Sequence, residues 1–246
     1  MAAPVPHRLC WICGAPANSA EHSVKRSDIF RLFGRGPYTK GNRLLKKTED
    51  GTRTVVQGPG SRHLTFENVI CQPCNNTLTQ PFDLAYDVFM DYVVANANSV
   101  LRERRIDLRR VFGVCGHKQY KNLFRYFVKS LGCRIADANR AVPADLSSAM
   151  RGGPLPSTLA LTFCVNEPLA AISSSLQKIA KVHRLAGTLD TLTKTHVDFV
   201  WDYSYGWLTI AFRYNRQPDP ALGEVWSGSF RHLVLGSLID ADQTGT

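Results

Sequence analysis

The spacing of apolar residues predicts helices in the middle of the chain. From residue 82 onward, apolar residues recur at helical spacing and predict an amphipathic helix that reaches about Leu101. A second series with the same period runs from Tyr120 to Leu131. We expect that helix to end near Gly132, because glycine is common just after a helix C-terminus.

Strand-like patterns follow a turn rich in glycine and proline at 149–157. Apolar and polar residues alternate over 159–165, 197–201 and 208–214, and this alternation predicts three strands. Residues 203–206 (Tyr-Ser-Tyr-Gly) predict a hairpin turn, and residues 172–185 predict a helix. The last apolar segment of the chain is residues 230–239. The fold class expected from these patterns is α+β, with a C-terminal α+β unit that contains a β-hairpin.

Residues 1–80 contain few periodic apolar positions, although 54–56 predict a short strand. A segment this poor in core-forming residues usually needs a metal ion to hold it together. We therefore predict three units: a metal-held domain at 1–80, a helical segment at 81–153 that packs on it, and an α+β domain at 154–246.

Composition narrows the class of protein. Of the 246 residues, 44% are hydrophobic and 20% are charged, which is typical of a globular protein. No apolar run reaches the roughly 18 residues of a membrane span, so no membrane role is expected. The first ten residues contain no apolar segment typical of a secretory signal, and the seven cysteines are an odd number. These features favour the reducing cytoplasm.

The positive charge is concentrated in one part of the chain. The formal charge is +10, and the region 1–80 holds 11 basic and 5 acidic residues, 81–153 holds 12 and 7, and 154–246 holds 7 and 8. The first 153 residues therefore carry the whole excess. A polyanion is the expected partner, namely DNA with RNA as the alternative.

Four of the cysteines form two C-x-x-C pairs, Cys10 with Cys13 and Cys71 with Cys74. Each pair places two thiolates on one side of a tight turn, and two such turns complete a tetrahedral site for structural Zn²⁺. The alternatives are four buried free cysteines or one redox pair, and neither accounts for two pairs.

Together with these pairs, Glu21-His22 and Asn75 give an order that resembles the HNH endonucleases of the four-cysteine type. The resemblance covers residues 10–90. It implies a ββα-metal finger, in which a β-hairpin and a helix hold one divalent ion, and it implies hydrolysis of phosphodiester bonds in DNA.

The resemblance also implies roles for single residues. His22 would be the general base, and Glu21 and Asn75 would hold a catalytic Mg²⁺ or Mn²⁺. The residue that orients the base through its backbone would be Asn68 or His63, with Asn68 preferred, because the spacing departs from the family pattern.

The segment between His22 and Asn68 is longer than in the family and is rich in basic residues. As a set, these residues are expected to bind the phosphate backbone. They are Lys25, Arg26, Arg31, Arg35, Lys40, Arg43, Lys46 and Lys47.

Two further hypotheses remain at this stage. The chain could be a non-catalytic zinc-knuckle protein that binds nucleic acid, and Glu21-His22 is the feature that argues against it. It could also be the effector of a bacterial defence system, with a protein partner on residues 154–246.

Overall fold

The computed structural model describes residues 8–38, 43–47, 52–172, 180–190, 192–193 and 196–239. The strands are β1 (Ser19–His22), β2 (Leu44–Lys47), β3 (Arg53–Val56), β4 (Thr65–Ile70), β5 (Arg105–Asp107), β6 (Leu159–Asn166), β7 (Ala180–Val182), β8 (Phe199–Tyr205), β9 (Leu208–Tyr214) and β10 (His232–Leu238). The helices are α1 (Arg26–Phe33), α2 (Gln80–Ala95), α3 (Ala97–Glu103), α4 (Leu108–Phe112), α5 (His117–Asp137), α6 (Ala144–Met150) and α7 (Glu167–Ala171). Short helical turns are η1 (Arg62–Leu64), η2 (Cys74–Leu78) and η3 (Pro220–Leu222).

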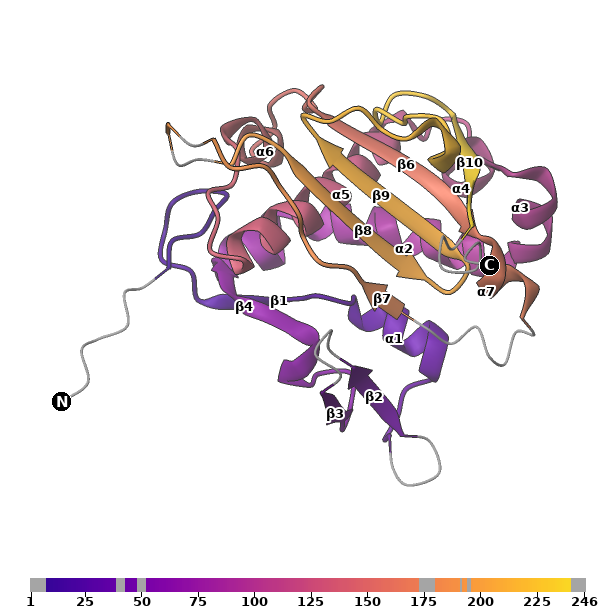
Figure 1. Ribbon diagram of the computed structural model, residues 1–246, viewed down its shortest axis with the longest axis horizontal. Helices are drawn as coiled ribbons and strands as arrows, with labels where there is room; N and C mark the ends of the chain where they lie inside the picture. The colour runs from indigo at the N-terminus through magenta and orange to yellow at the C-terminus, as the bar shows by residue number, and fades with distance from the viewer. Residues whose placement is uncertain are drawn as a thin grey trace.

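The fold is a mixed α+β arrangement, as the sequence predicts. A six-stranded sheet in the order β5-β10-β6-β9-β8-β7 lies against helices α2 and α5 (Figure 1). Its neighbouring strands are antiparallel except for β10 and β6, which run parallel. Strand β5 comes from the middle segment, so this sheet is not built from residues 154–246 alone.

Aromatic side chains fill the space between the helices and the sheet. Phe127 on α5 packs edge-on against Phe163 of β6, Phe212 of β9 and Trp226. On the side of the helices, Tyr86 stacks on Tyr126 with ring centroids 3.9 Å apart. Buried residues from all three predicted units belong to one connected core. The unit boundaries at residues 80 and 153 stay predictions.

A buried carboxylate joins three elements that are far apart in the sequence. Asp28 of α1 is fully buried and accepts hydrogen bonds from Tyr86 Oη of α2 at 2.7 Å and Tyr203 Oη of β8 at 3.1 Å. Arg31 donates to its other oxygen. Burial raises the pKa of Asp28 to about 6, although the tyrosine hydroxyls and Arg31 act in the opposite direction.

The helical predictions need two corrections. The helix expected from residue 82 to Leu101 is two helices, α2 and α3, with a break at Asn96. The second helix does not end near Gly132 but continues to Asp137. Gly132 serves close packing instead, because a Cβ atom there would collide with the indole ring of Trp11.

The C-terminal predictions are partly confirmed. Strands β6, β8 and β9 agree with the apolar alternation, with shifts of a few residues at the ends, and β10 lies within the last apolar segment of the sequence. The helix predicted over 172–185 is wrong at Ala180–Val182, which forms β7 and pairs with β8; residues 173–179 lie outside the described residues. The predicted turn at 203–206 is also displaced, since β8 continues to Tyr205. Among the described residues, no helix combines the length and apolar character that crossing a bilayer requires.

Candidate metal centre and candidate active site

The thiols of the four predicted cysteines lie close together. The Sγ atoms of Cys10, Cys13, Cys71 and Cys74 all lie within 4.8 Å of one another, and those of Cys13 and Cys71 are 3.6 Å apart. A Zn–S bond of about 2.3 Å places the sulfurs of a tetrahedral site roughly 3.8 Å apart. The cluster therefore fits a structural zinc ion, and the sequence prediction of its ligands is confirmed at this level.

Backbone hydrogen bonds shape the first cysteine turn. The amide of Gly14 donates to Cys10 O at 2.8 Å, and the amide of Cys10 donates to Ala15 O at 2.7 Å. Gly14 has a φ of 78°, which a residue with a side chain adopts only with strain. A backbone hydrogen bond from Ala15 lowers the pKa of the Cys13 thiol, whereas burial raises that of Cys10. Zinc binding converts both to thiolates.

The first cysteine turn is also fixed to α5. The Trp11 ring lies against Gly132, and its Nε1 donates to Cys133 Sγ at 3.4 Å. Arg151 donates to the carbonyl of Ile12 from the other side. The metal centre is therefore joined to the helical middle of the chain.

Strands β1 and β4 form a two-stranded sheet although α1, β2 and β3 separate them in the chain, and the helical turn η2 follows β4. The ββα-metal finger stays a prediction. β1 and β4 are antiparallel, with His22 opposite Thr65 and Ala20 opposite Asn68. The second cysteine pair leads directly into η2 and then α2 (Figure 1). The metal centre thus holds the start of the helix beside the strand that carries Glu21-His22.

His22 is oriented by a backbone carbonyl that sequence reasoning missed. Its Nε2 lies 3.2 Å from Pro59 O. A carbonyl can only accept, so Nε2 carries a hydrogen, and in the neutral ring Nδ1 is then the nitrogen with a free lone pair. Asn68 is exposed on β4, and His63 is exposed on η1. Among the hydrogen bonds of the described residues, the contact to the His22 ring comes from Pro59.

Asn75 faces β1 from the first turn after the cysteines. Its Nδ2 lies 3.0 Å from Ser19 Oγ and 3.5 Å from Ala20 O. These contacts use the amide nitrogen and leave the amide oxygen as a candidate metal ligand. The helix therefore presents an oxygen donor next to the strand segment that leads into Glu21.

Glu21 takes part in a buried ion pair. Its Oε2 lies 2.8 Å from the ammonium of Lys129, whose side chain is 2% exposed, and the same ammonium lies 2.9 Å from Asp83 Oδ2. Burial alone would lower the pKa of Lys129, but the carboxylates of Glu21 and Asp83 outweigh it and raise the pKa above its ordinary value. Lys129 therefore stays charged and joins α5 to β1 and α2.

Replacing Lys129 with methionine should destabilise the fold by about 3 kcal/mol, because two poorly solvated carboxylates would lose their shared cation. Denaturant unfolding measures this loss. The matched control is Lys121→Met on the same helix, where the side chain is exposed and the change should stay within about 0.5 kcal/mol. Equal stability of the two variants would show that Glu21 and Asp83 are adequately solvated without Lys129.

The predicted phosphate-binding residues divide into two groups. Lys25 and Arg31 are largely buried and form ion pairs with carboxylates of α2. Lys25 pairs with Asp83 and Asp87, and Arg31 pairs with Asp87. The second group is Arg26, Arg35, Arg43 and Lys47, which are exposed, and Lys46, which is half-buried and donates to His63 O. Lys40 lies outside the described residues. The second group is the part of the set that is available to a ligand.

Sequence reasoning also missed Asp83 and Lys129. Both lie on predicted helices, where charged residues are common, and no local sequence motif distinguishes them from ordinary surface charges. Comparison with protein-family models, with curated proteins and with solved structures finds no match for this chain. The site is therefore interpreted from its own residues.

Proposed function

We propose that the chain is a metal-dependent endonuclease that hydrolyses phosphodiester bonds in DNA. The observation that carries the proposal is the placement of Glu21-His22 at the end of β1, beside Asn75 at the start of a helix held by four cysteines. No matching protein supports the proposal. It rests on the geometry of the site and on the resemblance of its motifs to those of HNH endonucleases.

The proposed roles follow from the contacts of each residue. Pro59 O holds the His22 ring, so Nδ1 takes a proton from the attacking water. We assign this orienting role to Pro59 rather than to Asn68 or His63. Glu21 and Asn75 offer the oxygen donors that Mg²⁺ or Mn²⁺ prefers, and such an ion, when bound, stabilises charge on the phosphate and on the leaving oxygen.

The roles of Glu21 and Asn75 predict a change in metal requirement. Purified Glu21→Gln and Asn75→Ala should need about tenfold or more Mg²⁺ for half-maximal cleavage of plasmid DNA, because the first replaces a charged carboxylate with a neutral amide and the second removes an amide oxygen. Asn76→Ala is the matched control, since Asn76 is the exposed neighbour of Asn75. An unchanged metal requirement in both site variants would remove Glu21 and Asn75 from the ligand set.

The ion pair between Glu21 and Lys129 favours a second function, a zinc-knuckle protein that binds nucleic acid without cutting it. An ammonium at 2.8 Å already neutralises Glu21, so this carboxylate has a structural partner without a divalent ion. The plasmid assay separates the two, because binding without cleavage in Mg²⁺ and in Mn²⁺ selects the second function. A role in bacterial defence, and a protein partner on residues 154–246, stay predictions.

A further inference from the structure

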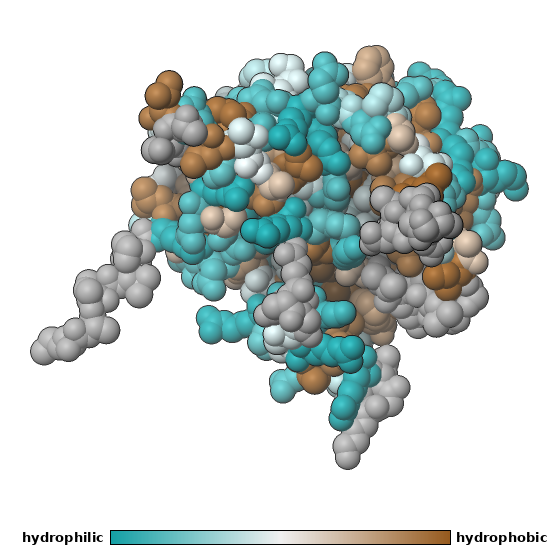
Figure 2. Space-filling model, in the orientation of Figure 1, coloured by the Kyte–Doolittle hydropathy of each residue, from teal (hydrophilic) through white to brown (hydrophobic). Residues whose placement is uncertain are grey.

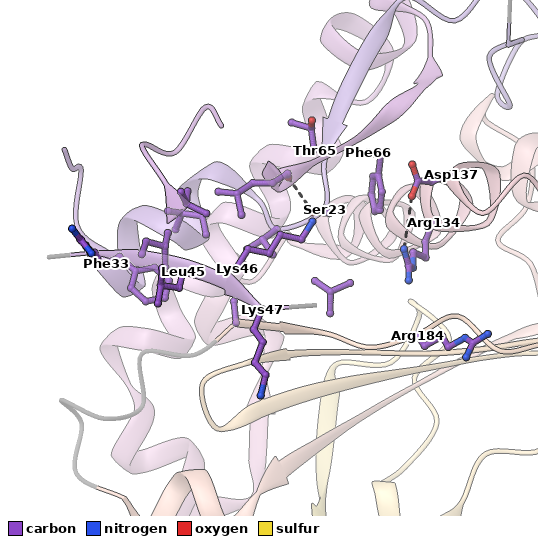
Figure 3. Close-up of a pocket in the computed structure, with 18 residues that line it drawn as sticks. Ser23, Phe33, Leu45, Lys46, Lys47, Thr65, Phe66, Arg134, Asp137 and Arg184 are labelled. Carbon is purple, nitrogen blue, oxygen red and sulfur yellow. Dashed lines mark hydrogen bonds and ion pairs between the residues drawn. The ribbon is translucent and has the colours of Figure 1, made fainter. Parts of the chain in front are cut away.

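A groove of about 770 Å³ opens beside the end of β1. Its walls come from the β2–β3 hairpin on one side, which carries Lys46 and Lys47, and from α5 and the β7 region on the other, which carry Arg134 and Arg184 (Figure 3). In Figure 2, hydrophilic side chains gather over the hairpin at the bottom of the view. We refer to this cavity as the hairpin groove.

The charge of the hairpin groove is strongly unbalanced. Of the residues that the structure describes, five cationic side chains line it together with one carboxylate, that of Asp137. Asp137 is already engaged, because it accepts the amide of Glu67 at 2.9 Å and lies 3.8 Å from Arg134. The cations are Arg43, Lys46, Lys47, Arg134 and Arg184. An anionic ligand complements this surface.

Arg134 lacks the partners that a buried guanidinium normally has. Its Nε is buried and has no hydrogen-bond partner among the described residues. Its other contacts are long, 3.5 Å to His183 O and 3.8 Å to Asp137. The terminal NH groups of Arg134 are therefore only weakly paired, and a phosphate oxygen in the groove would give them a closer partner.

The floor of the hairpin groove is apolar. It includes the half-buried ring of Phe33, the edge of the buried Phe66, and aliphatic side chains such as Leu44 and Val182. A duplex presents phosphates outward and keeps its bases stacked inside, so it has no use for such a floor. A single strand exposes both phosphates and base faces, and sites for it combine cations with aromatic rings. The volume also fits a short strand segment.

The hairpin groove adjoins the proposed catalytic base. Ser23, which follows His22, lines the groove, and so does Thr65, the cross-strand partner of His22. A second, small cavity is lined by His22 itself and shares Ser23 and Phe66 with the groove. A strand lying in the groove would therefore reach the neighbourhood of His22.

We propose that the hairpin groove binds single-stranded nucleic acid, with phosphates on its cations and bases on its apolar floor. This inference rests on the proposed function, because it names the form of nucleic acid that the proposed nuclease would bind. It adds Arg134 and Arg184 to the ligand-binding residues, and Arg184 comes from the C-terminal unit that sequence analysis left without a chemical role.

Fluorescence anisotropy of a labelled 12-nucleotide oligo(dT) strand, measured without divalent metal, tests the inference. The variant Lys47→Gln/Arg184→Gln removes one exposed cation from each wall. We expect at least a tenfold loss of affinity, and a slope of log K against log salt concentration that is smaller by about 1.4, since each phosphate contact on a single strand contributes about 0.7. The matched control, Arg102→Gln/Lys121→Gln, removes two exposed cations outside the groove and should keep the parent slope.

Equal losses in the groove variant and the control would overturn the inference, because they would reflect net charge alone. An equal loss of affinity for a labelled hairpin duplex would also overturn it. The nuclease proposal fails separately: if the parent binds oligo(dT) through the groove but no DNA is cut in Mg²⁺ or Mn²⁺, the groove assignment stands and the catalytic one does not.

Discussion

Replacing Cys74 with serine is expected to abolish zinc binding and to unfold the region around β1 and η2. Structural zinc contributes roughly 10–16 kcal/mol to the folding of small zinc domains, which equals or exceeds the whole stability of many proteins. Here the ion would join the turn at Cys10–Cys13 to the start of the helix at Cys71–Cys74. Elemental analysis and thermal unfolding measure the result.

The matched control for Cys74→Ser is Cys115→Ser. Cys115 is exposed and lies outside the cluster, so its replacement should leave one zinc per chain and an unchanged melting temperature. Two results would show that the four thiols do not form a structural metal site. One is wild-type protein that folds without zinc, and the other is a Cys74→Ser variant with the same melting temperature as Cys115→Ser.

Replacing His22 with alanine is expected to reduce DNA cleavage by about two to four orders of magnitude, the usual contribution of a general base. The His22 ring donates to Pro59 O and thereby keeps Nδ1 free for the proton of water. The variant should retain zinc and affinity for DNA, because His22 is assigned to neither. Single-turnover cleavage under saturating metal measures the loss.

Two control variants make the His22 test specific. His63→Ala and Asn68→Ala should each cleave at close to the parent rate, because both side chains are exposed and the ring contact comes from Pro59. A large loss in Asn68→Ala would return the orienting role to Asn68. Full cleavage by His22→Ala would favour the non-catalytic zinc-knuckle protein.

The sequence predicts most of what depends on local pattern. Apolar alternation locates β6, β8 and β9, and the spacing of cysteines identifies the metal ligands, because both signals lie within a few consecutive residues. The prediction for residues 172–185 fails at Ala180–Val182. A three-residue edge strand carries too little pattern to be distinguished from a helix, and its pairing with β8 is set by the sheet.

The contacts that complete the candidate site are non-local and leave no local signature. Lys129 reaches Glu21 across more than 100 residues, and Pro59 acts through a carbonyl that every residue possesses. Gly132 is similar. A glycine after an apolar helical pattern suggests a helix end, whereas here its missing side chain leaves room for the ring of Trp11. Such features become predictable only when the packing of distant elements is known.

The burial of Asp28 has a consequence for the order in which the chain folds. Asp28 and Tyr203 are 175 residues apart, so α1 acquires its full set of buried partners only after β8 exists. Contacts of this separation make folding slow, and at ribosomal rates of about 5–20 residues per second β8 follows α1 by roughly 9–35 seconds. The hairpin groove needs residues 180–184 for one wall and is completed equally late. A nascent chain therefore emerges from the ribosome, itself an RNA-rich particle, before its own surface for nucleic acid is assembled.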